Sequence, residues 1–525
     1  MAVGTVASRA TGFLRTAVLA SVLGVESVAA AYNVANTTPN IVYELLLGGV
    51  LTSVIVPLLV RAAKDDADGG QAYAQRLLTV TVLVLGGAAG LLVLGAPLLI
   101  DLYAGELDPQ SRQLAITFAR FFLPQVLFYG AGAVLGAVLN TRGRFAPPMW
   151  VPVLNNVVVI ATGLAFLVVR GAGELTPGGL TSGQVALLGL GTTLGIVAQT
   201  VALLPSLRAA GFTPRLRLDL RGTGLRTIGR LATWVLLYVV ANQLAYLVVV
   251  RLSTDQELID AGRGYPSYLL AFVLWQLPHA IVAVTVITAL LPRMSRAAAD
   301  GRTADLRGSL NRGLRLTVSV LVPAAVAFVV LGRELATVVF ARGQVSVEDA
   351  RFIGVLLAVF AVGLVPFSAY QLQLRAFYAM QDTRTPTLIN LGVNATLVSV
   401  DVVLYALLPA QYKVIGLAAG HATSFVAGLL LCSFVLSRRI GGLDVAVVLR
   451  TAARCLIAAA LPALPAALLA TTVTRAVGAG PLGAGLALLT GGLVLGAGYL
   501  LLARRLRVPE VDEVAGPVLR RLRLG

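Results

Sequence analysis

The sequence predicts an all-α integral membrane protein with about 14 transmembrane helices. Three observations indicate this class. Hydrophobic residues make up 58% of the 525 residues, charged residues only 12%, and the mean hydropathy is +0.87. A soluble domain carries about 25% charged residues, whereas a bilayer needs runs of about 20 apolar residues separated by polar breaks. The composition therefore argues against a chain built from soluble domains.

The apolar runs are long enough to define individual spans. Each run ends at a cluster of charged residues, glycine or proline. We place the predicted spans at residues 4–23, 28–60, 77–103, 113–139, 147–169, 183–205, 228–250, 264–291, 314–340, 352–374, 386–408, 414–437, 447–473 and 480–503.

The net charge of +17 follows this topology. With the N-terminus in the cytoplasm, 28 lysines and arginines fall in cytoplasmic segments and nine in segments on the other side. Cytoplasmic loops carry the excess of basic residues. We therefore expect a multi-pass protein of the cytoplasmic (inner) membrane with both termini in the cytoplasm. Nucleic acid is not an expected partner, because no basic helix with an aromatic platform lies outside the predicted spans.

Two pairs of similar segments indicate an internal repeat. Pro57 is followed four residues later by Arg-Ala-Ala at 61–63, and Pro292 by the same three residues at 296–298. Asn-Thr-Arg at 140–142 follows the fourth span, and Asp-Thr-Arg at 382–384 follows the tenth. Both pairs are six spans apart, which is typical of a transporter with two pseudo-symmetric lobes around a central site.

The repeat predicts three parts along the chain. Residues 1–218 form an N-terminal six-helix lobe and residues 219–440 a C-terminal six-helix lobe. The two lobes surround a central cavity. Residues 441–525 add two transmembrane helices and a basic cytoplasmic tail.

Polar residues in the first span form one stripe. At about 100° per residue they fall within an arc of roughly 120°. The stripe consists of Thr5, Ser8, Arg9, Gly12, Arg15 and Thr16. One interpretation is that the arginines face a water-filled cavity. The other is that they snorkel to the headgroups, which is easier for Arg9 than for Arg15, about 9 Å deeper along the helix.

The second span carries its own polar stripe around Pro39, a residue that a helix lining a cavity tolerates. The stripe is made of Asn33, Asn36, Thr37, Asn40 and Glu44. Glu44 has two open roles, which are not exclusive. It pairs with a first-span arginine, or it contacts a ligand directly.

Two later spans also place polar groups in the membrane. The eighth carries an aromatic stripe with two polar members: Tyr265, Tyr268, Phe272, Trp275, Gln276 and His279. Packing explains such a stripe better than ligand binding, but Gln276 and His279 make its middle a candidate substrate contact. The eleventh aligns Thr387, Asn390, Asn394 and Asp401. These residues are candidates for ion coupling, with helix-to-helix hydrogen bonding as the alternative for the asparagines.

Several chemistries are excluded by what the sequence lacks. It has no phosphate-binding loop motif, and its two histidines, His279 and His421, are too far apart for H-E-x-x-H. Its two cysteines, Cys432 and Cys455, provide neither a disulfide framework nor a metal cluster. We expect no cofactor, no metal site and no catalytic residues, and therefore not an enzyme.

Three groups of motifs resemble one transporter family. The first is Ser8–Arg15 with Leu23-Gly24 and Pro39-Asn40. The second is Gly136–Thr141 with Arg144-Phe145 and Pro147, and the third is Phe377–Thr383 with Thr385-Pro386. In this order they resemble the MurJ (MviN) family of lipid II flippases, within the multidrug/oligosaccharidyl-lipid/polysaccharide exporter superfamily. The resemblance covers roughly residues 4–440 and is closest to actinobacterial members.

The resemblance implies a flippase that moves lipid-linked peptidoglycan precursor by alternating access, driven by an ion gradient or the membrane potential. Its implied partners are a polyprenyl-pyrophosphate-linked glycopeptide, a coupling cation of unspecified identity, membrane lipids and cell-wall synthesis proteins. Arg9 and Arg15 match the two first-span arginines of the family's cationic cavity. The extra helix pair would form a groove for the polyprenyl tail.

The sequence departs from the family pattern at a few charged positions. Ala30 stands where many members have an acidic residue, Tyr43-Glu44 where they have an arginine pair, and Phe272-Val273 where they have Asp-Arg. The predicted cavity is therefore less cationic than the family's. The alternatives are a flippase of another polyprenyl-linked glycan, a multidrug/cation antiporter of the same superfamily, and a non-transporting membrane scaffold for cell-wall synthesis.

Overall fold

The computed structural model describes residues 2–45, 56–171, 175–219 and 225–513, and the regular elements in these ranges are helices. Among the described residues, 12 helices are long and apolar enough to cross a membrane, or 13 if one bent pair is a single span. This confirms the predicted all-α membrane class. The second predicted span, 28–60, includes residues 46–55, which lie outside the described residues.

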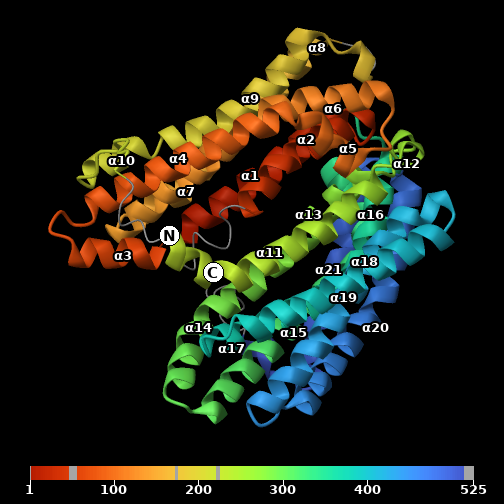
Figure 1. Ribbon diagram of the computed structural model, residues 1–525. Helices are drawn as coiled ribbons and strands as arrows, with labels where there is room; N and C mark the ends of the chain where they lie inside the picture. Colours follow the sequence, from red (N-terminus) through yellow and green to blue (C-terminus); the bar gives the residue numbers. More distant parts are fainter. Residues whose placement is uncertain (1, 46–55, 172–174, 220–224, 514–525) are drawn as a thin grey trace. The chain divides into compact units, whose positions relative to one another are not determined.

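The chain divides into two compact units, residues 1–266 and 267–525. The predicted lobe boundary at 218/219 remains a prediction. The elements of unit 1, whose α-helices are labelled in Figure 1, are in chain order α1 (Ala2–Leu23), α2 (Ser27–Tyr43), α3 (Val56–Asp65), α4 (Gln71–Leu94), α5 (Ala96–Ala104), α6 (Pro109–Phe122), α7 (Gln125–Thr141), α8 (Ala146–Arg170), the 3-10 turn η3 (Pro177–Gly179), α9 (Ser182–Val201), α10 (Leu204–Ala209), α11 (Leu225–Ser253) and α12 (Gln256–Asp260).

Unit 2 begins at Ser267, near the start of the next helix. Its elements are α13 (Tyr265–Pro278), the π-helical turn η4 (His279–Ala283), α14 (Val284–Ala299), α15 (Thr303–Phe340), α16 (Val347–Val362), α17 (Leu364–Ala379), α18 (Arg384–Leu407), α19 (Ala410–Arg439), α20 (Val445–Val477) and α21 (Pro481–Arg505).

Several predicted spans are interrupted rather than continuous helices. The third is divided at Gly95 into α4 and α5, and the sixth contains a break between α9 and α10. The fourth is divided at Leu123–Pro124 into α6 and α7, and the tenth bends by 46° at Gly363 between α16 and α17. The eighth changes to π-helix directly after Pro278. Proline removes a backbone donor and clashes with the preceding turn, and π-turns occur at helix irregularities. Hydropathy does not reveal such breaks, because their residues remain apolar.

The core of unit 1 fixes α2 against α6. Tyr32 is 1% exposed, and its ring meets Phe118 and Phe122 edge-on at centroid distances of 5.5 and 5.2 Å. Its hydroxyl lies 2.7 Å from the Thr192 hydroxyl on α9. Tyr32 therefore connects α2 to α6 and α9, and this fixes the rotation of α2 and of its polar stripe.

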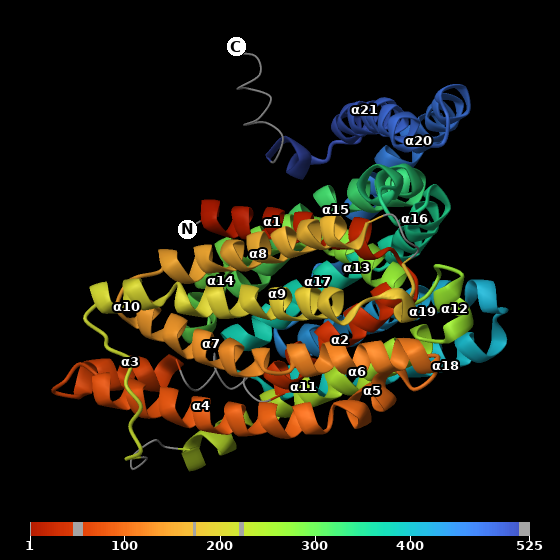
Figure 2. The same ribbon diagram turned by 90° about the horizontal axis from the view of Figure 1, so that it is seen from above.

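The last two helices pack along each other and against α15, as Figures 1 and 2 show. Tyr499 on α21 donates a 2.5 Å hydrogen bond to the Ser319 carbonyl of α15. Beyond α21, Val508 and Val511 are buried in the same cluster as Tyr499. These contacts fix α20 and α21, the two extra predicted helices, to the rest of unit 2.

Candidate functional site

The polar stripe of α1 lies beside α8. Asn156 on α8 is 5% exposed, and its Nδ2 donates to the Ser8 carbonyl at 3.2 Å and to the Thr11 hydroxyl at 3.0 Å. Gly12 faces the same amide group, since a Cβ built there would lie at van der Waals distance, 3.5 Å, from Nδ2. Asn156 therefore sets the rotation of α1 about its axis.

The two arginines of α1 differ in exposure. Arg9 is exposed, whereas Arg15 is partly buried. Within the described residues, neither guanidinium forms a hydrogen bond or an ion pair. Arg15 lies within electrostatic range of Tyr32 on α2 and Tyr129 on α7. Arg15 is therefore a cationic group that is partly enclosed by unit 1 and available to an anion.

The stripe on α2 extends from buried to exposed positions. Asn33 and Asn36 are partly buried, and Asn40 and Glu44 are exposed. Asn40 donates to the Asn36 carbonyl at 3.2 Å. Neither arginine of α1 forms an ion pair with Glu44 in the described chain, so the structure does not show the pairing proposed for it.

The middle of the α2 stripe is tied to the end of unit 1. The Thr37 hydroxyl bonds to the Asn33 carbonyl at 2.8 Å and lies 3.0 Å from the Tyr265 hydroxyl. The Tyr265 hydroxyl in turn lies 2.5 Å from that of Tyr246 on α11. Tyr265, predicted as part of an aromatic stripe, therefore belongs to this hydrogen-bonded group.

The positions where the sequence departs from the family pattern are largely used for packing. Ala30 is fully buried in the core of unit 1, and the Tyr43 ring packs 5.7 Å from that of Tyr129. In unit 2, Phe272 packs against Phe360 and His421. Ala30, Tyr43 and Phe272 therefore contribute to packing at their positions.

The aromatic stripe of the eighth span is mainly a packing surface. Tyr268 and Trp275 are 3% and 1% exposed and contact rings from α16 and α19. His279 Nδ1 lies 2.8 Å from the Ser368 hydroxyl on α17. Gln276 is the exposed polar member and is the one available to a ligand.

Asp401 on α18 is the most unusual polar group of unit 2. It is 0% exposed, and within the described chain neither carboxylate oxygen has a hydrogen-bond partner. It packs directly on α19, because a Cβ built at Gly420 would lie 1.9 Å from its Oδ1. Buried polar groups nearly always have partners, so this carboxyl group needs a functional explanation.

The two asparagines of α18 lie apart from Asp401. Asn390 is 4% exposed and Asn394 is partly buried. At a rise of 1.5 Å per residue, Asn394 lies about 10 Å and Asn390 about 16 Å from Asp401 along the helix. The three side chains share a face but are too far apart to coordinate one ion together.

Sequence patterns did not identify two residues of this region, Asn156, which bonds to α1, and Tyr129, which lies within electrostatic range of Arg15. Asn155-Asn156 is nevertheless an adjacent polar pair within an apolar span. Such a pair inside a membrane helix was a usable signal. Which helix it faces depends on packing, which the sequence does not state.

The family follows from comparison with known proteins. The family model described as "Lipid II flippase MurJ" matches residues 19–484. The chain belongs to this family. A probable lipid II flippase MurJ from Rhizobium meliloti is 29% identical over 473 residues, covering 87% of this chain and 83% of the relative. The lipid II flippase MurJ from Burkholderia cenocepacia is 27% identical over 397 residues, covering 74% of each.

Solved structures share the fold. A structure titled as lipid II flippase MurJ in an inward closed conformation aligns with a TM-score of 0.75 and 18% identity, covering 96% of this chain and 99% of that one. An inward-facing multidrug resistance MATE family transporter aligns with a TM-score of 0.65 and 15% identity, covering 82% and 94%. The MurJ family is one of transporters, and the chain is accordingly a multi-span membrane protein.

Proposed function

We propose that the chain translocates lipid II, the lipid-linked peptidoglycan precursor, across the cytoplasmic membrane by alternating access. The observation that carries this proposal is the match to the MurJ family model over residues 19–484, which includes helices of both units. The arginines of α1, exposed or partly buried and without ion pairs in the described chain, support an anionic substrate. We accordingly propose a transporter without catalytic activity of its own.

The substrate contacts lie on α1 and α2 of unit 1. Arg15 would bind the pyrophosphate, because a guanidinium offers five donors in a fixed plane and stays charged when partly buried. Arg9 lies at a more exposed position on the same face. The other proposed contacts are Ser8, Asn33, Asn36, Asn40 and Glu44, with Gln276 of α13 added on the strength of its exposure.

Coupling would be carried by α18 of unit 2. A buried carboxyl group without a partner binds a proton or a small cation more readily than it remains as an isolated charge. We assign this role to Asp401, with Asn390 and Asn394 as supporting polar positions further along the helix. The driving force is an ion gradient or the membrane potential.

The proposed topology has two six-helix lobes, residues 1–218 and 219–440, around a central cavity. Residues 441–525 would be an appendage that accommodates the polyprenyl tail. Both termini would be cytoplasmic, as the distribution of basic residues predicts. Reporter fusions at Gly525 and near Gly171 should therefore report opposite sides of the membrane.

Depletion and reconstitution test the function. Cells depleted of the chain should accumulate lipid II on the cytoplasmic face, and proteoliposomes holding the purified chain should move labelled lipid II between leaflets. Export of cationic drugs without movement of lipid II would support a multidrug/cation antiporter. Movement of neither, together with a cell-wall defect on depletion, would support a scaffold that acts with cell-wall synthesis proteins.

A further inference from the structure

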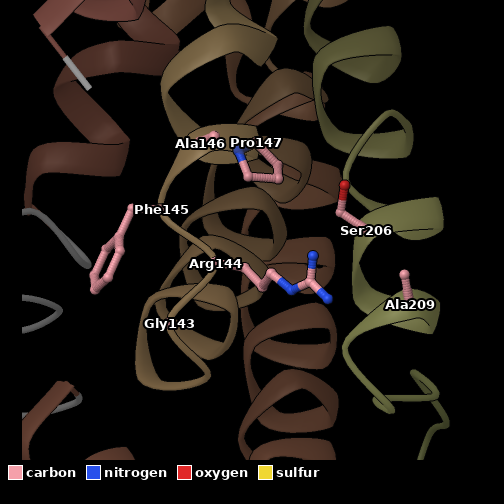
Figure 3. Close-up of a pocket in the computed structure, with 7 residues that line it drawn as sticks. All are labelled: Gly143, Arg144, Phe145, Ala146, Pro147, Ser206 and Ala209. Carbon is pink, nitrogen blue, oxygen red and sulfur yellow. The ribbon is translucent and has the colours of Figure 1, made fainter.

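Unit 1 contains a pocket between the segment that follows α7 and the short helix α10. It has a volume of about 420 Å³ and is lined by Gly143, Arg144, Phe145, Ala146, Pro147, Ser206 and Ala209. Figure 3 shows the Arg144 side chain extending toward α10, from which Ser206 and Ala209 project. The Phe145 ring points to the other side of the loop.

The pocket is cationic. Segments 140–148 and 203–213, which contain all its lining residues, hold three arginines and no aspartate or glutamate. Arg142 is occupied, since it donates to the Ala210 carbonyl at 2.7 Å and lies over the Phe212 ring. Within the described residues, the Arg144 guanidinium has neither a hydrogen bond nor an ion pair. Arg144 therefore provides an unused charge and up to five donors.

The corresponding position in unit 2 contains an anion supplied by the chain itself. By the six-span repeat, the loop before α18 corresponds to the loop before α8. There Asp382 accepts hydrogen bonds from the Thr385 amide at 3.0 Å, the Thr385 hydroxyl at 2.7 Å and Arg439 at 2.7 Å. Arg439 ends α19, so the carboxylate joins the loop to the helix that corresponds to α9 and α10.

Electrostatics at this unit 2 position favour a negative charge. Burial raises the pKa of the Asp382 carboxyl, but the Thr385 hydrogen bonds and the Arg439 charge outweigh it and hold the pKa below its ordinary value. The equivalent residue of unit 1 is Asn140, which is uncharged. In the described part of unit 1 the unpaired charge lies on the loop instead, as Arg144, and segments 140–148 and 203–213 contain no aspartate or glutamate to pair with it.

We propose that the unit 1 pocket binds the phosphate of an anionic membrane phospholipid, with Arg144 and the Ser206 hydroxyl as donors. Pro147 and Pro148 have no N–H, so the start of α8 adds little and the guanidinium supplies the main attraction. This site does not depend on what the chain transports, because none of its lining residues is among the proposed substrate contacts.

The surroundings favour a lipid headgroup over a free phosphate. Phe145 and Trp150 are 43% and 48% exposed on either side of the start of α8. Exposed aromatic residues beside basic residues are typical of the membrane interface. The segment is also among those predicted to be cytoplasmic, where anionic lipids attract basic residues.

Lipid retention by the purified full-length chain tests the site. Native mass spectrometry would compare phosphatidylglycerol with phosphatidylcholine for wild type, Arg144→Ala, Arg144→Lys and the control Arg215→Ala, an exposed arginine outside the pocket. We expect Arg144→Ala to weaken retention of one phosphatidylglycerol about fivefold. Arg144→Lys should be intermediate, and Arg215→Ala should match wild type. Equal retention by wild type and Arg144→Ala, or equal losses in Arg144→Ala and Arg215→Ala, would overturn the proposal.

A second variant supplies the missing anion. Ser206→Glu should place a carboxylate opposite Arg144, as Asp382 lies beside Arg439, and remove the phosphatidylglycerol site while leaving the melting temperature unchanged or higher. Ser206→Gln is the uncharged control of similar size and should retain the lipid. Wild-type retention by Ser206→Glu, or equal losses in both variants, would contradict the charge-based site. Displacement of the lipid by millimolar glycerol phosphate would identify a free phosphate as the ligand instead.

Discussion

Arg15 in unit 1 is partly exposed on α1, whereas Asp401 in unit 2 is fully buried on α18. Both are charged residue types within candidate membrane spans, and neither forms an ion pair in the described chain. A partly hydrated guanidinium keeps its charge and can bind a bulky anion. A carboxyl group sealed between two helices is accessible only to a proton or a small cation. This comparison is the basis for proposing substrate binding at Arg15 and coupling at Asp401.

The largest expected effect on activity comes from substitution of Arg15. Arg15→Ala should abolish complementation of a flippase-deficient strain, because the pyrophosphate loses a planar, forked donor. Arg15→Lys should be impaired but measurable. Arg9→Ala is the matched control on the same helix and should be tolerated better. Full complementation by Arg15→Ala at normal membrane abundance would remove Arg15 as the pyrophosphate ligand.

Asp401→Asn should affect the coupling of lipid II movement to its driving force. The substitution keeps the shape of the side chain but cannot carry a negative charge. We expect normal expression and a weaker dependence of lipid II movement on the ion gradient or membrane potential, measured in proteoliposomes with imposed gradients. Unchanged dependence would make Asp401 a packing residue and leave the assignment of unit 2 without support.

The sequence predicts the positions of both residues in this comparison but not their contacts. The α1 stripe and the Asp401 position follow from helical periodicity, since a polar group in an apolar span is visible in one sequence. The contacts that these residues make do not follow from helical periodicity. Asn156 meets Ser8 and Gly420 meets Asp401 only because particular helices pack together, which composition does not specify.

The sequence pattern also does not predict the breaks in the helices or the hydrogen bond that joins a loop to the end of α19. Pro124 and Pro278 mark irregular points, yet prolines within α15 and α20 do not divide those helices. Neighbouring helices decide which proline interrupts a span. The bond between Asp382 and Arg439 joins residues 57 apart and depends on the packing of α18 on α19.

Gly420 provides a sharper test of how tightly Asp401 is enclosed. A methyl group at Gly420 would lie 1.9 Å from the Asp401 Oδ1 atom, so Gly420→Ala should lower the free energy of unfolding by about 1–3 kcal/mol. The double variant with Asp401→Ala should recover much of this loss, as measured by thermal unfolding in detergent. Additive losses in the double variant would show that the two residues do not pack as described.

The smallest expected effect concerns the loop ion pair of unit 2. Arg439 and Asp382 side chains are 48% and 11% exposed, so Asp382→Asn should cost about 1 kcal/mol at neutral pH. Because the pKa of Asp382 is held below its ordinary value, this contribution is complete above that ordinary value and is lost as the pH falls through the lowered one. Melting curves of wild type and variant should therefore converge as the pH falls below about 4. A difference that persists unchanged in acid would contradict the assignment to a charged pair.

The affinity of the purified chain for undecaprenyl pyrophosphate tests whether Arg15 binds the pyrophosphate of the substrate. Wild type, Arg15→Ala and Asp401→Asn would each be titrated with this lipid under identical conditions. A lost charge-assisted hydrogen bond corresponds to a loss of affinity of about tenfold to 100-fold. We expect this loss for Arg15→Ala and near wild-type affinity for Asp401→Asn. Equal affinities for wild type and Arg15→Ala, or a loss confined to Asp401→Asn, would contradict the account.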